Sequence, residues 1–125
     1  MVDGKGKIKT YRDLGVWQVG MKILRKVYEV TRKYPKYEQY GGMAGQSQRA
    51  AVSIPANIAE GFARGHQKEH KQGYNISVGS CAELGTLVIA ANDVGYLNPP
   101  DYQELIDLIE YEFKMLVNLI NTIDD

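Results

Sequence analysis

Two histidines and a glutamate stand close together in the segment 66-HQKEH-70. On a helix, His66 and His70 would lie one turn apart on the same side. Two imidazoles at that spacing can share a zinc ion, and Glu69 stands where one class of zinc peptidase carries its general base. A catalytic zinc needs a third protein ligand, but the chain has only these two histidines and a single cysteine. We therefore interpret the segment as the polar first turn of a helix and predict no metal site and no cofactor.

The single cysteine, Cys81, is the other residue whose side chain could act as a nucleophile. It lies between Ser80 and Ala82 amid apolar neighbours, without a partner base beside it. A thiol in such surroundings behaves as a small hydrophobe. One cysteine cannot form an internal disulfide, which favours a reducing compartment such as the cytoplasm. We assign no catalytic residue and expect a protein that is not an enzyme and has no small-molecule substrate.

A polar stripe runs through 46-QSQRAAVSIPANIAEGFARG-65 at helical spacing. At about 100° per residue its polar side chains fall within roughly 80° of one another, and small or apolar residues occupy the rest of the circumference. A buried polar group without a partner costs about 1–3 kcal/mol, so we expect the stripe to find partners within its own helix and on the next one. The predicted polar network consists of Arg49, Ser53, Asn57, Glu60, Ser80 and Glu83.

This network has two possible roles. Satisfied polar groups between helices can fix how the helices pair, or the same groups could form a ligand site or an acid/base pair. The segment has no nucleophile and no phosphate-binding glycine loop, so we favour the structural role. Pro55 lies inside the segment, and because proline removes a backbone hydrogen bond we expect it to bend or break the helix near Ala51.

Charge is divided unevenly along a chain whose formal net charge is zero. Residues 1–49 carry eleven Lys and Arg against four Asp and Glu, a balance of +7, and residues 50–125 carry four against eleven, a balance of −7. Either a basic surface meets an anionic partner, or the two halves pair within the fold or between subunits. The candidate nucleic-acid-binding residues are Lys22, Arg25, Lys26, Arg32, Lys33 and Lys36, with Lys5, Lys7, Lys9 and Arg12 preceding them.

Binding to such a surface would go through backbone phosphates, because no motif in the sequence reads bases. Tyr34, Tyr37 and Tyr40 follow the basic segment and could stack on bases. We favour packing and loop anchoring as their role.

Four helices must position these residues. Hydrophobic spacing and the Gly and Pro breaks predict helices over about 16–34, 43–63 and 67–93, and a fourth after Pro99-Pro100. Tyr34 precedes Pro35, which should end the first helix. No segment alternates with period two, so we expect no sheet. The predicted fold is all-α, an up-down-up-down antiparallel four-helix bundle over residues 13–125 that follows a flexible basic tail at 1–12.

The third and fourth helices carry apolar residues on more than one side. In the fourth helix we expect Leu108, Met115 and Leu119 to lie away from the main apolar face, with Glu112 nearby. A helix that is apolar all round is buried on several sides, so we expect self-association, although surface leucines that are merely tolerated are the alternative. No apolar run approaches the roughly 20 residues of a membrane span, and the first residues do not form a signal peptide.

The run QSQRAAVSIPANIAEGFARG, with YRDLGVWQVGMKILRKVYEVTRKYP before it and GSCAELGTLVIAANDVGYL after it, resembles a family of four-helix bundles first described as proteins encoded in intervening sequences of 23S ribosomal RNA genes. The accessory variability determinant of diversity-generating retroelements belongs to the same family. The similarity covers about residues 11–122. It implies a homopentameric barrel, and in the retroelement members a basic barrel surface that engages a reverse transcriptase and RNA or DNA.

The family pattern supplies no catalytic residue, and the polar network matches its signature positions as architecture. Two functions therefore stay open. The protein could be a non-enzymatic adaptor for a reverse transcriptase and nucleic acid. It could also be a self-assembling structural or interaction protein without nucleic-acid binding, because this chain is neutral where the retroelement members are basic.

Overall fold

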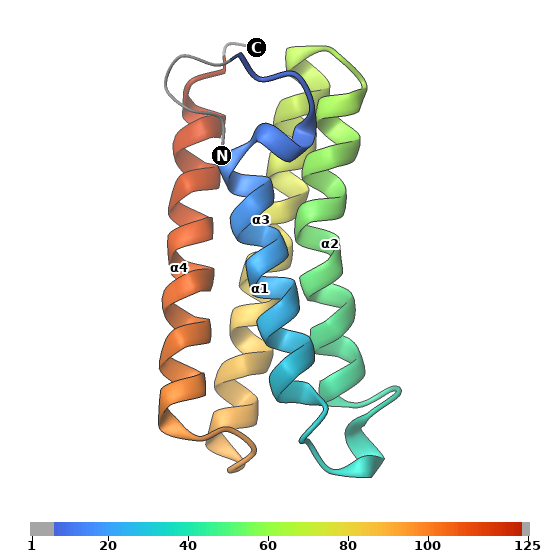
Figure 1. Ribbon diagram of the computed structural model, residues 1–125, viewed down its shortest axis with the longest axis vertical. Helices are drawn as coiled ribbons and strands as arrows, with labels where there is room; N and C mark the ends of the chain where they lie inside the picture. The colour runs from blue at the N-terminus through green and yellow to red at the C-terminus, as the bar shows by residue number, and fades with distance from the viewer. Residues whose placement is uncertain (1–6, 124–125) are drawn as a thin grey trace.

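The computed structural model describes residues 7–123, and four α-helices run side by side in it, alternately up and down (Figure 1). The helices are α1 (Gly15–Thr31), α2 (Met43–Ala63), α3 (Gln67–Asp93) and α4 (Pro99–Asn121), and two short 3-10 helices are η1 (Tyr11–Asp13) and η2 (Lys36–Glu38). No strand occurs among the described residues. The predicted all-α four-helix bundle is thus the fold of this chain.

Three of the four helix ends that the sequence marked with glycine or proline occur as predicted. Helix α2 is followed by Gly65 and α3 by Gly95, and both glycines have positive φ, 81° and 88°. Only glycine adopts that conformation without strain, so it ends a helix. Helix α4 begins after Asn98, whose side chain accepts a hydrogen bond from the Asp101 backbone N–H at 2.8 Å. This bond caps one of the free amides at the start of the helix.

Helix α1 ends three residues before the predicted limit at Tyr34. The chain tightens after Thr31, with the Tyr34 N–H bonded to the Thr31 carbonyl, three residues back. The side-chain amide of Gln39 donates to the carbonyls of Thr31 and Tyr34 at 2.9 and 3.0 Å. A side chain from the following loop therefore satisfies the end of α1.

The ordered body begins within the predicted tail. Thr10 caps η1, and the Asp13 carboxylate accepts the backbone N–H groups of Lys9 and Thr10 at 2.9 and 3.1 Å. These bonds lower the pKa of Asp13. The Tyr11 ring meets the Trp17 ring edge to face at 5.4 Å. Residues 1–6 of the predicted tail lie outside the described residues.

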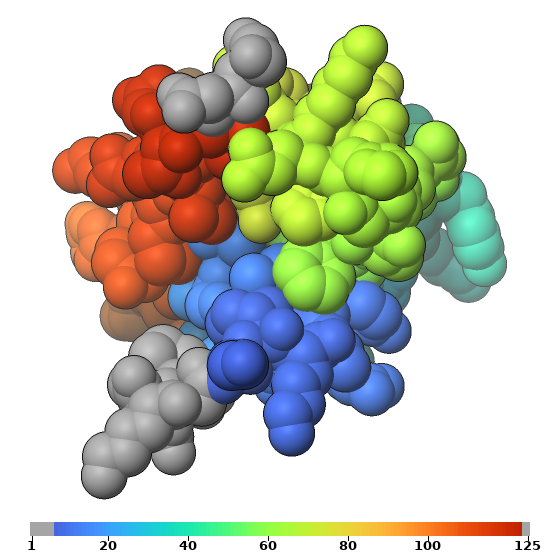
Figure 2. All heavy atoms as spheres, turned by 90° about the horizontal axis from the view of Figure 1, so that it is seen from above, coloured from blue at the N-terminus to red at the C-terminus, as the bar shows by residue number. Residues whose placement is uncertain are grey.

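The core lies along the axis of the bundle, and every helix contributes to it. Fully buried side chains include Ile23 on α1, Ile54 and Ile58 on α2, Leu84 on α3 and Leu116 on α4. Figure 2 looks onto the end of the bundle where the turn between α2 and α3 lies beside the last turns of α4, with the start of α1 opposite. Because the interior of the bundle is filled by this core, the outer faces of the helices are the surfaces that can contact a partner or ligand.

Two glycines let α2 and α3 approach each other closely. A Cβ added to Gly61 would lie 2.6 Å from the Glu69 carbonyl oxygen, and one added to Gly73 would overlap the Asn57 carbonyl. Real side chains cannot occupy that space, so the two backbones meet here. The contact fixes the height of α3 relative to α2.

Pro55 does not break α2, which is helical from Met43 to Ala63. Of the expected bend or break, the break is therefore wrong, and the bend stays a prediction. The proline is buried against α1, where a Cβ on Gly20 would lie 3.4 Å from the Pro55 Cβ. The Ser77 hydroxyl of α3 donates to the Ile54 carbonyl at 2.8 Å. Packing on α1 and α3 thus holds the helix continuous through the missing backbone bond.

The buried face of α4 differs from the predicted one. It is centred on Leu105, Glu112 and Leu116, all with no exposed surface, while Phe113 is 40% exposed. Leu108, Met115 and Leu119 pack against the core in partly buried positions. The expectation that they form a separate outer patch is therefore wrong. The main apolar face indicated by the sequence included Leu105, Ile109, Phe113 and Leu116, and the buried face has Glu112 in place of Phe113.

Candidate functional site

The candidate nucleic-acid-binding residues fall into two groups in the structure. Lys22 and Arg25 of α1, Arg32 directly after its end and Lys36 of η2 are exposed. Within residues 7–123, none of these four side chains forms a salt bridge. We call these four residues the basic row. Their charges remain available to an anionic partner.

Lys26 and Lys33 face α4 and are paired with its acidic residues. The Lys26 ammonium lies 2.9 Å from Asp101 and 3.2 Å from both Glu104 and Glu29. Its bond to Asp101 raises the pKa of Lys26 and lowers the pKa of Asp101. Lys33 lies 3.8 Å from Asp101 and is 60% exposed. The opposite charges of the two halves of the chain thus partly neutralise each other along the seam between α1 and α4.

The polar stripe of α2 is linked to α3 through three of its predicted members. The Ser53 and Ser80 hydroxyls lie 2.7 Å apart. The Asn57 amide donates to the Ser53 carbonyl at 2.8 Å and to the Ser53 hydroxyl at 3.0 Å. Ser80 is buried and the other two are half-buried. This small cluster joins α2 to α3, in keeping with a structural role.

The other three members of the predicted network lie apart from this cluster. Glu60 pairs with Arg64 of the same helix at 3.1 Å on the exposed surface. Glu83 is exposed. Arg49 is exposed and reaches the Tyr40 carbonyl at 3.5 Å. Helical periodicity places these residues on one side of their helices, but the neighbours that they meet differ.

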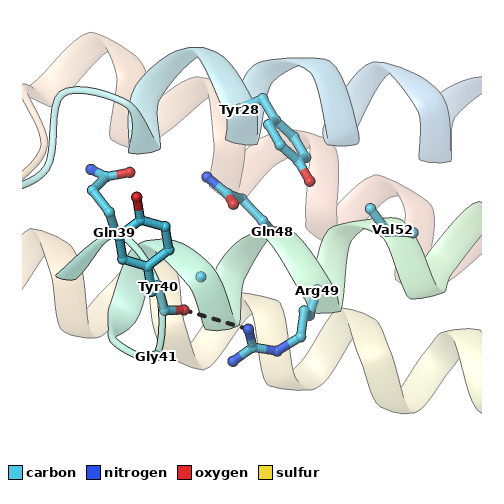
Figure 3. A pocket seen from close by; sticks show the side chains of 8 residues that line it. Tyr28, Gln39, Tyr40, Gly41, Gln48, Arg49 and Val52 are labelled. Atoms are coloured by element: carbon cyan, nitrogen blue, oxygen red, sulfur yellow. Dashed lines mark hydrogen bonds between the residues drawn. The ribbon is translucent and has the colours of Figure 1, made fainter.

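Arg49 lies at the edge of a hollow between α1 and α2, shown in Figure 3. The hollow has a volume of about 600 Å³. Its walls come from both helices and from the loop between them. The lining residues are Tyr28, Gln39, Tyr40, Gly41, Gly45, Gln48, Arg49 and Val52. Sequence reasoning missed this site, although it had noted the tyrosines of the loop.

The loop that walls the hollow is held at both ends. The Glu38 carboxylate accepts the Met43 N–H at 2.9 Å, which caps α2, and it accepts the Tyr96 hydroxyl at 2.8 Å. A Cβ on Gly45 would overlap the Tyr40 carbonyl, so glycine is needed for the loop to lie against the first turn of α2. Because the neighbouring residue Gln39 caps α1, the loop joins two helix ends in a fixed arrangement.

The histidine pair does not meet further metal ligands in the described part of the chain. The His70 ring stacks on Phe62 at 5.1 Å, and His66 is exposed at the start of α3. Residues 7–123 contain no group of three or more His, Cys, Asp or Glu placed to hold a metal ion. Cys81 is buried, and burial together with the charge of Glu112 raises the pKa of its thiol to about 12.

Glu112 is the buried ionisable group that sequence reasoning did not place in the core. It has no exposed surface, and its carboxyl oxygens have no hydrogen-bond partner among the described residues. Burial raises the pKa of Glu112 to about 8. The signal was present in the sequence, because Glu112 fits the helical spacing of Leu105, Ile109 and Leu116.

The architecture is that of an all-α bundle protein. Residues 12–118 match the family of the 23S rRNA-intervening sequence protein, and this match spans most of the chain, so the chain belongs to that family.

A similar solved structure is that of a protein of unknown function from the S23 ribosomal protein family of Bacteroides thetaiotaomicron. It is 17% identical, the match covers 85% of this chain and 95% of that chain, and the TM-score is 0.77. At this identity the likeness shows the fold alone. None of the curated proteins matches this chain. Over residues 7–123, no helix combines the length and the apolar character that a membrane crossing needs.

Proposed function

We propose that this protein is a non-enzymatic, homo-oligomeric adaptor that binds nucleic acid through the basic row and also binds a partner protein such as a retroelement reverse transcriptase. The observation that carries the proposal is the set of exposed cations on α1 and η2 without acidic partners. Lysine and arginine that neutralise phosphates release condensed counterions, which drives binding. Lys7, Lys9 and Arg12 are also exposed and add positive charge before α1.

Self-association is supported by apolar side chains on the outer faces of the bundle. Val52 on α2 is 40% exposed, and Ile76 and Ile89 on α3 are each 46% exposed. Exposed apolar surface of this kind favours an interface. In a homopentamer, the arrangement implied by the sequence resemblance, the basic row would be repeated five times around the assembly.

The test is a salt titration of binding to single-stranded RNA, with the basic row reversed in charge. We expect the logarithm of the affinity to fall linearly with the logarithm of the salt concentration, by about 0.7 for each phosphate neutralised. Replacing Lys22, Arg25, Arg32 and Lys36 together by Glu should abolish binding. Lys114→Glu, an exposed change on α4, is the matched control and should reduce binding much less. An affinity that is independent of salt, or a quadruple variant that still binds, would contradict the proposal.

A second candidate is a self-assembling interaction protein that does not bind nucleic acid. The pairing of Lys26 with Asp101 favours it, because part of the charge asymmetry is used inside the fold. Both candidate functions predict self-assembly, but only the first predicts RNA binding. Light scattering that gives an oligomer, with no RNA binding at low salt, would favour the second candidate, and a monomer at micromolar concentration would contradict both. Capture of a reverse transcriptase by the purified protein would favour the first.

A further inference from the structure

We propose that the hollow between α1 and α2 binds one nucleotide, with its base against the rings of Tyr28 and Tyr40 and its phosphate on Arg49 (Figure 3). The nucleotide is a free mononucleotide or one unit of a single strand, and both present the same chemistry to the hollow. This site goes beyond the basic row and requires neither that row nor assembly. It also departs from the sequence-based expectation of no small-molecule ligand.

The size and the walls of the hollow suit a small ligand. Its volume of about 600 Å³ falls within the roughly 300–1,000 Å³ of typical ligand sites. Two aromatic rings border it, Tyr28 at 38% and Tyr40 at 86% exposed, and Val52 adds an apolar side chain at 40% exposed. Aromatic side chains bind nucleobases by stacking, because every base has a π face.

The two glutamine side chains that line the hollow offer acceptors. The Gln39 amide nitrogen uses both of its hydrogens, on the Thr31 and Tyr34 carbonyls, so its orientation is fixed. The Gln48 amide nitrogen donates to the Thr31 hydroxyl at 3.0 Å. Neither amide oxygen receives a hydrogen bond from a described residue, and Figure 3 shows the Gln39 oxygen on the side of Tyr40 and Gln48. Since amide oxygens only accept, they suit a ligand that brings hydrogen-bond donors, such as the amino group of an amino-bearing base.

Arg49 supplies the charge for the phosphate. Its bond to the Tyr40 carbonyl is 3.5 Å long, beyond the usual 2.7–3.2 Å, so most of its five donors are free. No acidic residue lines the hollow, and no described carboxylate forms a salt bridge with Arg49. A guanidinium binds phosphate through two parallel hydrogen bonds.

The first experiment is calorimetric titration of the full chain with AMP and with three matched ligands that each lack one group. Adenosine lacks the phosphate, ribose 5-phosphate lacks the base, and purine riboside 5′-monophosphate lacks the amino group. We expect AMP to bind about tenfold more tightly than adenosine or ribose 5-phosphate, because a charged hydrogen-bonded contact or a stacked base is worth about that factor. Purine riboside 5′-monophosphate should bind more weakly than AMP because its base carries no N–H donor.

The second experiment uses variants of exposed residues, which should leave the fold intact. Arg49→Gln should weaken AMP about tenfold and leave adenosine unchanged. Tyr40→Ala should weaken both ligands. Arg64→Gln, which changes an exposed arginine directly after α2, is the matched control and should leave the affinities for AMP and adenosine unchanged. Circular dichroism melting of each variant checks that it is folded.

The outcomes separate this site from the basic row. AMP that binds no better than ribose 5-phosphate, equal losses in the Arg49 and Arg64 variants, or no AMP and no strand binding at millimolar concentration would overturn the proposal. If a 5′-phosphorylated oligoadenylate binds and AMP does not, and both pocket variants abolish strand binding, the nucleotide belongs to a strand. If AMP does not bind and strand binding depends on the basic row alone, the hollow is not a nucleotide site and the adaptor function stands. If AMP binds through Arg49 and no strand binds, the hollow is a nucleotide site and the proposed adaptor function fails.

Discussion

Lys26 on α1 and Glu112 on α4 are both ionisable residues at contacts between helices, but they differ in exposure and in the number of their partners. Lys26 keeps 12% of its side chain exposed and has three carboxylates within 3.2 Å. Glu112 has no exposed surface and no hydrogen-bond partner among the described residues. The pairing favours the charged form of Lys26, whereas burial favours the neutral form of Glu112. The contrast shows that burial and charged partners together decide which protonation state the fold stabilises.

The largest effect should come from Glu112→Met, which removes the buried acid but keeps an unbranched side chain. The ordinary pKa of 4.5 applies to the unfolded chain, and the pKa near 8 to the folded one. Below pH 4.5 both states hold the proton; as the pH rises to 8, the unfolded state ionises first and the wild type loses stability. A shift of this size corresponds to about 5 kcal/mol.

Urea denaturation between pH 4.5 and 8 measures this loss. We expect the free energy of unfolding of Glu112→Met, relative to the wild type, to rise steadily through this range and to level off above pH 8. Glu110→Met changes an exposed acid two residues away, on another face of α4, and serves as control. A difference between the variant and the wild type that does not depend on pH would show that Glu112 is ionised in the folded protein or has a partner there.

The next effect should come from Gly20→Ala, which crowds the Glu112 carboxyl. The added Cβ would lie 3.2 Å from a Glu112 oxygen and 3.3 Å from Ile54. Overpacking of this kind costs about 1–3 kcal/mol, so the free energy of unfolding should fall by that amount. Gly79→Ala, at a helical position with open space around it, is the matched control and should not destabilise the protein. Equal effects of the two changes would mean that the neighbours of Gly20 move aside freely.

A smaller loss is expected for Asp101→Asn at the paired site. This change removes the shortest contact of Lys26, and a hydrogen bond to a charged group contributes about 1–2 kcal/mol at such a half-buried position. Because pairing lowers the pKa of Asp101, its contribution is present above the ordinary pKa and is lost as the pH falls through the folded value. The wild type and the variant should therefore converge in stability at acid pH. A double-mutant cycle with Lys26→Met measures the coupling, and a coupling of zero would contradict the pairing.

The smallest effect should come from Lys33→Ala. Lys33 lies 3.8 Å from Asp101 and is 60% exposed, and exposed pairs contribute about 0–1 kcal/mol. We expect a change below about 0.5 kcal/mol that disappears in high salt. A larger loss that persists in high salt would show that the ion pair of Lys33, like that of Lys26, is shielded from solvent.

Helix limits could be predicted where the signal is local. Gly65 and Gly95 follow α2 and α3, and Asn98 precedes two prolines, so each end carries its own marker in the sequence. The end of α1 could not be placed in this way. It depends on Gln39, a side chain eight residues beyond Thr31 that returns to cap the helix.

The functional surface was harder to predict than the fold. Helical periodicity predicted the side of α2 on which Arg49 lies, but it could not predict that Arg49 contacts the loop before α2. The position of that loop depends on a distant residue, Tyr96, which follows the end of α3 and bonds to Glu38. Lys26 shared a basic face with Arg25 in the sequence, and only the packing of α4 distinguishes them. Glu112 was missed for a different reason, since a charged residue was assumed to face water.

The adjacent residues Glu38 and Gln39 cap two different helices, and this limits how the loop can vary in length. Surface loops usually tolerate insertions. Here the caps serve the start of α2 and the end of α1 from neighbouring positions. One extra residue between them would turn one of the two side chains away from its helix. We expect this loop to keep its length among functional variants, while the turn after Gly65 can accept insertions.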